Sequence, residues 1–337
     1  MIIRARVPLR ISFAGGGTDV SPYTDEYGGA VLNTTISRFA TVSLKPRADS
    51  KIVVNSIDFD KTVHYDLAED FSLEGQFALI EGVIKHFKKY YTLPSGFEIT
   101  IQNDAPPGSG LGSSSAVSVA LIGALLEFVG ETLTPYEIAE LSYKIERIDV
   151  GIKGGRQDQY AAAFGGFNFI EFTKDYTLVQ PLKLKVETIL ELEHRLVVAY
   201  IGGSHDSSKI LSEQIKKAKK GDNLEALHQQ KALAYELKKA LLLGHFDEMG
   251  EILNKAWQVK KSMASGITNK KIDGIYEEAI KAGAIGGKIS GAGGGGFMFF
   301  LTKPENRYNV MNAIRNMGAQ PINYVFYPEG LQIWKIR

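Results

Sequence analysis

Residues 106–116, Pro-Pro-Gly-Ser-Gly-Leu-Gly-Ser-Ser-Ser-Ala, have the composition of a loop that binds an anion. Glycine occupies every second position from Gly108 to Gly112, and three serines lead into an apolar run over residues 117–129. Because glycine reaches positive φ without a steric penalty, successive amides can curl toward one point, and the N-terminus of the following helix adds its positive dipole end. The pattern predicts a site for a polyphosphate.

A glycine- and serine-rich connection before a helix can also be a plain loop with Ser113 as the N-cap. Here the small residues follow a strand-like run over 97–101 and two prolines, and they are more numerous than a cap requires, which favours phosphate binding. Two familiar phosphate motifs are absent, because no GxxxxGK[ST] occurs and Ser113 replaces the third glycine of GxGxxG. We therefore expect neither a P-loop nor a Rossmann fingerprint.

Two carboxylates downstream could serve phosphoryl transfer. Glu146 lies in a helix that is expected to begin at Thr134-Pro135, and Asp158 follows twelve residues later in Gly154-Gly155-Arg156-Gln157-Asp158. Transfer to a hydroxyl needs a divalent cation that offsets the charge of a triphosphate and a carboxylate that orients or accepts the hydroxyl proton. A lone carboxylate on a helix is more often a solvated surface charge. The residue types alone therefore do not assign these roles to Glu146 and Asp158.

Composition limits the class of protein. The length of 337 residues suggests two domains of ordinary size or one large domain, and the composition, 44% hydrophobic and 23% charged, is that of a soluble globular protein. The net charge of +1 argues against nucleic acid or an anionic membrane as the main partner. Cysteine is absent and the six histidines form no ligand-spaced pair, which excludes disulfides and thiolate sites. Without a signal peptide or a membrane-length apolar run, we expect a cytoplasmic protein.

Another glycine-rich stretch, the third along the chain after residues 15–17 and 108–112, lies at residues 287–298. Its sequence is Gly-Lys-Ile-Ser-Gly-Ala-Gly-Gly-Gly-Gly-Phe-Met, and it contains a formal GxGxxG over 291–296. A dinucleotide-binding motif requires a helix after its last glycine. The apolar run 297–301 predicts a strand instead. The dinucleotide interpretation therefore fails.

Three stretches together resemble the motifs of the GHMP kinases, the superfamily of galactokinase, homoserine kinase, mevalonate kinase and phosphomevalonate kinase. Residues 106–116 are similar to its PPxxGLGSSA motif with one extra serine, and residues 7–19, VPLRISFAGGGTD, align without a gap with APGRVNLIGEHTDY. Residues 288–296 are similar to KxxGAGxGG, which the family carries between a helix and a strand, and whose glycines let the backbone approach the ligand and the nucleotide loop. The resemblance covers essentially the whole chain.

The resemblance implies an α+β fold, the GHMP kinase two-domain fold, with the active site between the domains. Residues 1–180 would form the ATP-binding domain, of the ribosomal protein S5 domain 2-like type, with a mixed sheet and helices on one face. Residues 181–337 would form a ferredoxin-like C-terminal domain with a smaller sheet and more helices.

Local patterns predict the following elements: strands at 30–36, 39–44, 51–57, 61–67 and 97–103, a helix at 76–91, strands from Gly166 to about 201, about four helices between 207 and 282, a helix at 305–317 and two strands within 321–336. The lysine runs at 216–220 and 260–261 are expected to be solvated helix faces. Trp257 and Met263 are expected in the core, and His205 is a candidate substrate contact.

Roles of single residues also follow from the resemblance. It implies that Asp158 is the catalytic base, that Arg10 lies near the transferred phosphoryl group, and that Ser114 and Glu146 hold Mg²⁺. The ATP-binding residues would be Pro107, Gly108, Ser109, Gly110, Leu111, Gly112, Ser113, Ser114 and Ser115. The substrate-binding residues would be Gly16, Gly17, Thr18, Asp19, Lys153, Arg156 and Gly293, with Asp19 holding sugar hydroxyls.

The first motif also bears on the acceptor. Gly16 and Gly17 stand where galactokinases carry the Glu-His used on galactose, which argues against galactose. The FAGGGTD form is similar to that of kinases acting at the anomeric position, the heptose-phosphate kinases and, more distantly, the L-fucokinases. The resemblance implies an ATP-dependent sugar kinase that converts D-glycero-D-manno-heptose 7-phosphate to the 1,7-bisphosphate for nucleotide-activated heptose synthesis. Lys153 and Arg156 would then offset the phosphate of the acceptor.

Two alternatives stay open at this point. Another anomeric sugar kinase, acting on fucose or a uronic acid such as glucuronate, would keep all three motifs. A catalytically silent sugar sensor could use the same fold, although the presence of Arg10, Glu146 and Asp158 opposes it. The sequence is compatible with a monomer or a homodimer.

Overall fold

Two β-sheets organise the chain in the computed structural model, which describes residues 1–203 and 207–336. The larger sheet runs β12-β1-β2-β5-β3-β4, and β6 pairs with β2 and with β7. Its strands are β1 (Ile2–Ala14), β2 (Gly29–Pro46), β3 (Lys51–Ser56), β4 (Lys61–Asp66), β5 (Phe97–Asn103), β6 (Phe167–Phe172), β7 (Thr177–Pro181) and β12 (Gln332–Ile336). The β3–β5 pair is parallel and the other described pairs are antiparallel, so the sheet is mixed.

The sequence predicts two strands over 30–36 and 39–44, and this prediction is wrong, because β2 is one continuous strand. The register shifts between Pro8 and Leu9 of β1, which face Phe39 and Ile36 of β2. Proline has no N–H to donate to the ladder, so the two extra residues of β2 are accommodated there as a bulge. The strand therefore bends without ending.

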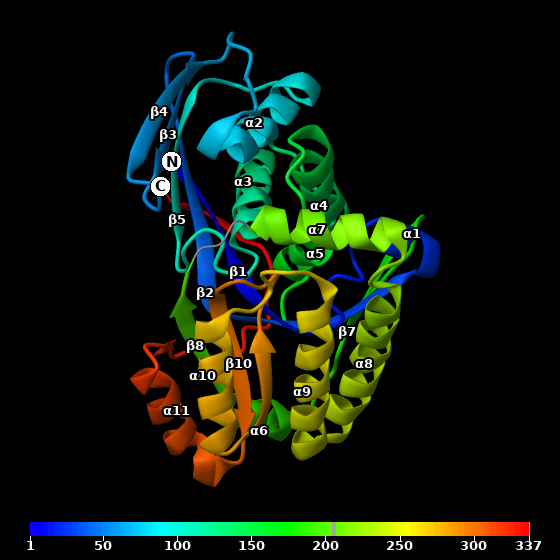
Figure 1. The fold of residues 1–337 in the computed structure, drawn as a ribbon. Coiled ribbons are helices and arrows are strands. Elements are labelled where there is room, and N and C mark those ends of the chain that lie inside the picture. The colour runs from blue at the N-terminus through cyan, green and yellow to red at the C-terminus, as the bar shows by residue number, and fades with distance from the viewer. Residues whose placement is uncertain (204–206, 337) are drawn as a thin grey trace.

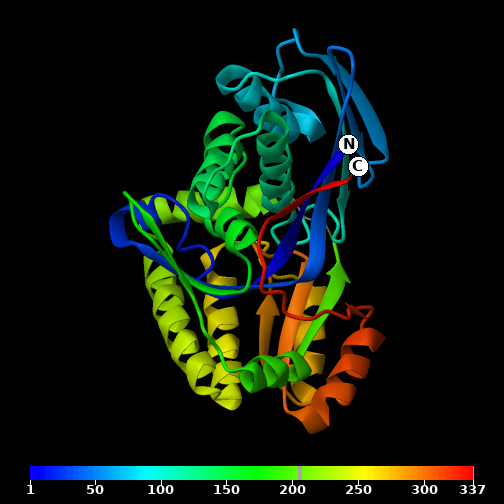
Figure 2. The same ribbon diagram turned by 180° about the vertical axis from the view of Figure 1, so that it is seen from behind.

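Helices cover one face of the larger sheet (Figures 1 and 2). They are α2 (Ala78–Tyr90), which follows the short helix η1 (Gly75–Phe77), together with α3 (Ser113–Val129), α4 (Pro135–Tyr143) and α5 (Gln157–Phe164). The helix α3 is apolar on most of its surface and is buried among the sheet and its helical neighbours. A capping box between Thr134 and Glu137 starts α4, which continues into a π-helical turn at Lys144–Asp149.

The smaller sheet has the order β11-β8-β10-β9 and is antiparallel. Its strands are β8 (Leu196–Gly202), β9 (Ala284–Ile289), β10 (Gly296–Thr302) and β11 (Gln320–Pro321). The remaining helices are α1 (Tyr23–Tyr27), α6 (Val186–Arg195), α7 (Ser207–Lys220), α8 (Leu224–Leu243), α9 (Phe246–Met263), α10 (Lys270–Lys281), η3 (Pro304–Asn306) and α11 (Arg307–Asn316). Figure 1 shows α7 crossing the molecule between its upper and lower parts. Trp257 and Met263 are fully buried in the second core, as expected.

Two local expectations are wrong in this half of the chain. The segment Val186–Arg195 is a surface helix rather than a strand, with Leu192 as its buried residue and with a first-turn acid and last-turn bases that suit the helix dipole. The glycine-rich stretch at 287–298 joins β9 to β10, so it lies between two strands and not between a helix and a strand.

The last strand returns to the first sheet. Residues of β12 pair antiparallel with β1, from Ile2 opposite Ile336 to Arg6 opposite Gln332, and the N and C labels lie side by side in both ribbon views (Figures 1 and 2). A domain boundary at residues 180–181 remains a prediction, and the larger sheet includes this strand from beyond it. Among the described residues, no helix has the length and apolarity needed to cross a bilayer.

Candidate active site

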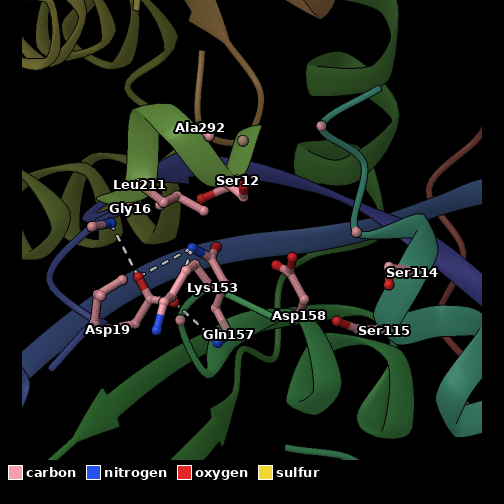
Figure 3. A pocket seen from close by; sticks show the side chains of 18 of the residues that line it. Ser12, Gly16, Asp19, Ser114, Ser115, Lys153, Gln157, Asp158, Leu211 and Ala292 are labelled. Atoms are coloured by element: carbon pink, nitrogen blue, oxygen red, sulfur yellow. Dashed lines mark hydrogen bonds between the residues drawn. The ribbon is translucent and has the colours of Figure 1, made fainter. Parts of the chain in front are cut away.

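A cavity of about 200 Å³ brings the three glycine-rich stretches together. Its walls include Gly16 and Gly17 from the first stretch, and Gly291 and Ala292 from the third. The second stretch contributes Gly108, Gly110 and Gly112 of the loop before α3 and Ser113, Ser114 and Ser115 of the first helical turn. Side chains from α5, α7 and α9 complete the lining. Figure 3 shows Asp158 in this cavity between Ser114 and Ser115 on one side and Lys153 and Gln157 on the other.

The loop before α3 has the geometry of an anion-binding turn. Gly108, Gly110 and Gly112 all have positive φ, at 74°, 84° and 74°. Gly112, and not Ser113, is the N-cap of α3, and no side chain in the described part of the chain caps this end. The amides of the first helical turn therefore remain available to a ligand, which is the requirement for binding phosphate at a helix N-terminus.

The third glycine-rich stretch packs backbone to backbone against this loop. A Cβ atom on Gly110 would lie 2.3 Å from the carbonyl oxygen of Ser290, and one on Gly291 would lie 2.7 Å from the Cα of Gly110. The amide of Phe297 also donates to the carbonyl oxygen of Ser109 at 3.0 Å. Glycine is required on both sides of this contact because no side chain fits between the loops.

Arg10 connects the loop to Asp158. Its Nε donates to Asp158 Oδ1 at 2.7 Å, its Nη1 donates to the carbonyl oxygen of Gly110 at 2.5 Å, and its main-chain N donates to that of Leu111 at 3.0 Å. Arg10 lies in the middle of β1 with 4% of its surface exposed, whereas the Asp158 side chain, in the first turn of α5, is 20% exposed. Arg10 on β1 thus holds the partly exposed carboxylate of Asp158 beside the anion-binding turn.

Glu146, in the π-helical turn after α4, contacts the first turn of α3 and is fully buried. Ser114 Oγ donates to its Oε1 at 3.0 Å, which Arg147 also contacts at 3.0 Å. Ser115 Oγ and Gln159 Nε2 donate to Oε2 at 2.7 and 2.6 Å. These four donors fix the carboxylate beside the Ser114 hydroxyl at the cavity wall.

The Ser114–Glu146 pair has the donor chemistry that Mg²⁺ prefers, a hydroxyl and a carboxylate oxygen. Among the residues that the structure describes, no group of three His, Asp or Glu side chains could hold a metal by itself. Mg²⁺ in phosphoryl-transfer sites usually takes one or two carboxylates and completes its shell with phosphate oxygens and water. The residues present fit that mode of binding.

Asp19 is held at the opposite end of the cavity from the serines. Its Oδ1 accepts from the amide of Gly17 at 3.0 Å, and its Oδ2 accepts from the amide of Gln157 at 3.1 Å. A Cβ atom on Gly155 would lie 1.9 Å from Asp19 Oδ2, so the carboxylate occupies the space that a side chain would need. The carboxylate is 2% exposed and still lines the cavity.

Several of the residues expected at the site lie behind its wall. Thr18 donates through Oγ1 to the carbonyl oxygen of Gly15 at 2.8 Å, and Gly293 packs against Ile267. Pro107, Ser109 and Leu111 support the loop without lining the cavity. His205 lies outside the described residues.

Arg156 is turned away from the cavity, whereas the exposed Lys153 lines it. Arg156 Nη1 donates to the carbonyl oxygen of Thr173 at 3.3 Å. The Arg156 guanidinium lies 4.9 Å from the ring centroid of Tyr143 and 4.0 Å from Asp25. With these contacts, Arg156 is not among the residues that line the cavity.

Two lysines that the sequence did not assign to the site lie in the cavity wall. The expectation that Lys260 is solvated is wrong, because Lys260 and Lys288 are each 2% exposed. Lys288 Nζ donates to the carbonyl oxygen of Ser12 at 2.9 Å. Burial lowers the pKa of Lys260 to about 8, and burial together with the charges of Lys260 and Arg10 holds the pKa of Lys288 well below its ordinary value.

A signal for Lys260 was present in the helical periodicity. The buried positions of α9 are Met249, Gly250, Ile252, Leu253, Ala256, Trp257, Lys260 and Met263, so this lysine continues an apolar stripe at three- and four-residue spacing. Lys261 leaves the stripe and lies 3.6 Å from Asp273. Lysine is rarely fully buried in proteins, so a lysine on a buried helical stripe is a candidate for a functional role. This signal outweighs the expectation that the two adjacent lysines are solvated.

Comparison with known proteins identifies the family of the chain. Residues 78–166 match the family model for the GHMP kinases N terminal domain, and residues 237–320 match that for the GHMP kinases C terminal region. The chain is 41% identical over 338 residues to D-glycero-alpha-D-manno-heptose 7-phosphate kinase of Campylobacter jejuni, with 99% of each chain covered.

Two further similarities are to proteins that act on sugars according to their names. The bifunctional L-fucokinase/L-fucose-1-P guanylyltransferase of Bacteroides fragilis is 29% identical over 349 residues, which cover 95% of this chain and 37% of that protein. The crystal structure of a D-glycero-D-manno-heptose 1-phosphate kinase from Bacteroides thetaiotaomicron superimposes with a TM-score of 0.83 at 36% identity, with 99% of each chain covered.

Proposed function

The chain belongs to the GHMP kinase family and is an ATP-dependent sugar kinase, and we propose that its acceptor is D-glycero-D-manno-heptose 7-phosphate, phosphorylated at the anomeric hydroxyl. The observation that supports this acceptor is the full-length similarity to a protein of that name. The glycines at positions 16 and 17, in place of a Glu-His pair, are consistent with it.

In the proposed reaction, the anomeric oxygen of the acceptor attacks the γ-phosphorus of ATP, the bond from that phosphorus to the β-γ bridging oxygen breaks, and ADP leaves. Asp158 takes the proton of the attacking hydroxyl, because its carboxylate is exposed to the cavity beside the phosphate loop. Arg10 offsets the charge that builds on the transferring group, and the amides before α3 bind the β- and γ-phosphates. The products are the heptose 1,7-bisphosphate and ADP.

We infer that Mg²⁺ is the metal of the reaction and that Ser114 and Glu146 hold it. When bound, Mg²⁺ supplies positive charge that neutralises the triphosphate. The chain supplies no lysine in the phosphate loop to do this instead.

We assign Lys153 to the phosphate of the acceptor. Its side chain is exposed and lines the cavity, and within the described part of the chain its ammonium has no ion pair. A sugar phosphate carries about −2 charge near neutral pH, which a lysine in the acceptor region would offset. The expectation for Arg156 is not retained, because its guanidinium contacts Thr173 and Tyr143 outside the cavity.

A panel of acceptors tests the proposed function. ADP release is measured with heptose 7-phosphate, the unphosphorylated heptose, L-fucose, glucuronate and galactose, and phosphorus NMR identifies the phosphorylated carbon. We expect the highest kcat/KM with heptose 7-phosphate and an anomeric phosphate in the product. A preference for fucose or glucuronate would overturn the acceptor but not the kinase activity. Sugar and ATP binding without turnover would support the sensor alternative.

A further inference from the structure

Lys260 places an ammonium group in the wall of the cavity, from the smaller-sheet half of the molecule. The described part of the chain offers it neither a hydrogen bond nor an ion pair. The charged groups that act on it are the Asp19 carboxylate, which favours its charged form, and Arg10 and Lys288, which oppose it. Lys260 therefore lines the same cavity as Asp19 without being paired to that carboxylate.

A buried cation without a partner is costly, because burial removes the hydration of the charge and nothing replaces it. The lowered pKa of Lys260, about 8, expresses that cost. Its neighbour Lys261 avoids the cost, because it is half-buried and lies 3.6 Å from Asp273. Lys260 therefore needs a partner that the described part of the chain does not supply.

Other polar atoms around this cavity also lack a partner. Gln157 Oε1, Gln214 Nε2 and Ser12 Oγ are buried and form no hydrogen bond with any residue that the structure describes, and all three residues line the same cavity as Lys260. They come from different elements, α5, α7 and β1 respectively. Unsatisfied buried polar groups cost free energy unless a ligand completes them, so this set points to a polar ligand.

The chemistry of the set favours hydroxyl groups over a phosphate. Asp19 and Gln157 Oε1 can only accept hydrogen bonds, while the Lys260 ammonium and Gln214 Nε2 can only donate them. A hydroxyl does both, whereas a phosphate dianion would be repelled by the Asp19 carboxylate. Lys153, which the proposed function assigns to the acceptor phosphate, lies on the loop before α5 and not on α9.

We propose that Lys260 is a specificity-determining residue that binds hydroxyl groups of the acceptor sugar together with Asp19, with Gln157 and Gln214 completing the contacts. This inference rests on the proposed sugar kinase function and names a further residue of the same site. Under this proposal, Lys260 binds the uncharged hydroxyl groups of the acceptor and Lys153 binds its phosphate.

Lys260→Met tests this division, because methionine has a similar length and no charge. We expect KM for heptose 7-phosphate to rise roughly 10- to 100-fold, the range for a hydrogen bond to a charged group, with KM for ATP little changed. KM for the unphosphorylated heptose should rise by the same factor, because the lost contact is to a hydroxyl. Lys261→Met is the matched control on the same helix and should leave all three constants unchanged.

The pH profile separates binding from a structural role. In the parent enzyme, KM for the acceptor should rise as the pH passes about 8, where Lys260 loses its proton, and this rise should be absent in Lys260→Met. A variant with parental KM for both sugars, or one whose KM rises only for the phosphorylated sugar, overturns the inference. So does a fall in kcat or ATP affinity at constant acceptor KM, which would place Lys260 at the transferring phosphoryl group.

The failure of the proposed acceptor can be told apart from the failure of this inference. If the parent enzyme selects another sugar in the acceptor panel, the heptose assignment fails, and the two variants are compared on the selected sugar. If the parent turns over none of them, the variants are compared by calorimetric binding of heptose 7-phosphate. An unchanged affinity in Lys260→Met then overturns the inference.

Discussion

Arg10 contacts Asp158 through two nitrogen atoms, Nε and Nη2, which both lie 2.7 Å from the same carboxylate oxygen, Oδ1. Within the described part of the chain, Oδ2 accepts no hydrogen bond, and the side chain is 20% exposed to the cavity. The two oxygens therefore have different environments. Oδ1 fixes the orientation of the carboxylate, and Oδ2 is available to take a proton from an acceptor.

Asp158→Asn should lower kcat by roughly 10²- to 10⁴-fold, the usual contribution of a positioned base, because an amide oxygen is a very weak base. ATP affinity should be nearly unchanged, since the amide oxygen can still accept from Arg10. Steady-state kinetics and titration with a fluorescent ATP analogue measure the two quantities. Near-parental turnover would remove Asp158 from the role of base.

Glu146→Gln should raise the Mg²⁺ concentration needed for half-maximal activity by at least about 10-fold, because the lost charge is a ligand charge. The new amide group would also face donors from Ser115 and Gln159, so a loss of roughly 1–3 kcal/mol of stability is expected. Activity against Mg²⁺ concentration and urea unfolding measure these effects. Glu137→Gln, in the capping box of α4, is the control, and an unchanged metal requirement in Glu146→Gln would point to another ligand.

Gly110→Ala should weaken ATP binding by at least about 10-fold, because alanine is strained at a φ of 84° and its Cβ would meet the carbonyl oxygen of Ser290 at 2.3 Å. The loop must then move from its position at the start of α3. Gly130→Ala is the control at the other end of that helix, with a φ of 79° and no atom within 4 Å of its Cβ. It should cost about 1–2 kcal/mol of stability and leave ATP binding intact. Normal ATP affinity in folded Gly110→Ala would exclude this loop as the triphosphate site.

Lys153→Met should raise KM for the phosphorylated acceptor by roughly 10- to 100-fold, while KM for the unphosphorylated sugar and for ATP stay constant. The physical reason is that only the phosphate of the acceptor requires this charge. Arg156→Lys should change none of these constants, because the side chain contacts Thr173 and Tyr143 away from the cavity. The opposite pattern in the two variants would return the phosphate site to Arg156.

Lys260→Met should also be more stable than the parent protein near pH 7. The pKa of this lysine is about 8 in the folded state against an ordinary 10.5, so below pH 8 the folded state bears the full cost of the buried charge. Between about pH 8 and 10.5 the unfolded state binds more protons, and the stability of the parent rises with pH. The free energy of unfolding of the variant should exceed that of the parent by up to roughly 3 kcal/mol at pH 7, and the difference should disappear by about pH 10.5. Urea unfolding at several pH values measures it, and a less stable variant at pH 7 would contradict the expectation.

The parts of the site that the sequence predicted are those encoded locally. The alternating glycines at 108–112 determine the loop conformation by themselves, and the structure gives all three the expected positive φ. The separation of Glu146 and Asp158 along the chain is large enough that only the fold brings both to one cavity. Their assignment depended on the resemblance to a family, because a carboxylate on a helix carries no local mark of its role.

The expectations that failed depend on tertiary packing. Lys260 and Lys261 are adjacent and chemically identical, and only the position of α9 against the cavity buries Lys260 fully while Lys261 stays half-buried beside Asp273. The role of Arg156 is a different case, because it stays a prediction: Arg156 is two residues from Asp158, and its guanidinium lies 4.9 Å from the ring centroid of Tyr143. The surface helix Val186–Arg195 contains valine, threonine and isoleucine, residues that local propensity favours in strands.

The contact between Gly110 and Gly291 also bears on how the history of such a site can be read from sequences. The Cα of Gly110 and the position of a Cβ on Gly291 would be 2.7 Å apart, so a larger residue on one side has no smaller residue on the other side to compensate for it. Compensation is what produces paired changes between contacting positions. A pair at which neither position can vary produces none. Methods that infer contacts from covariation would therefore detect no signal for this pair, although it joins the loop before α3 to the third glycine-rich stretch.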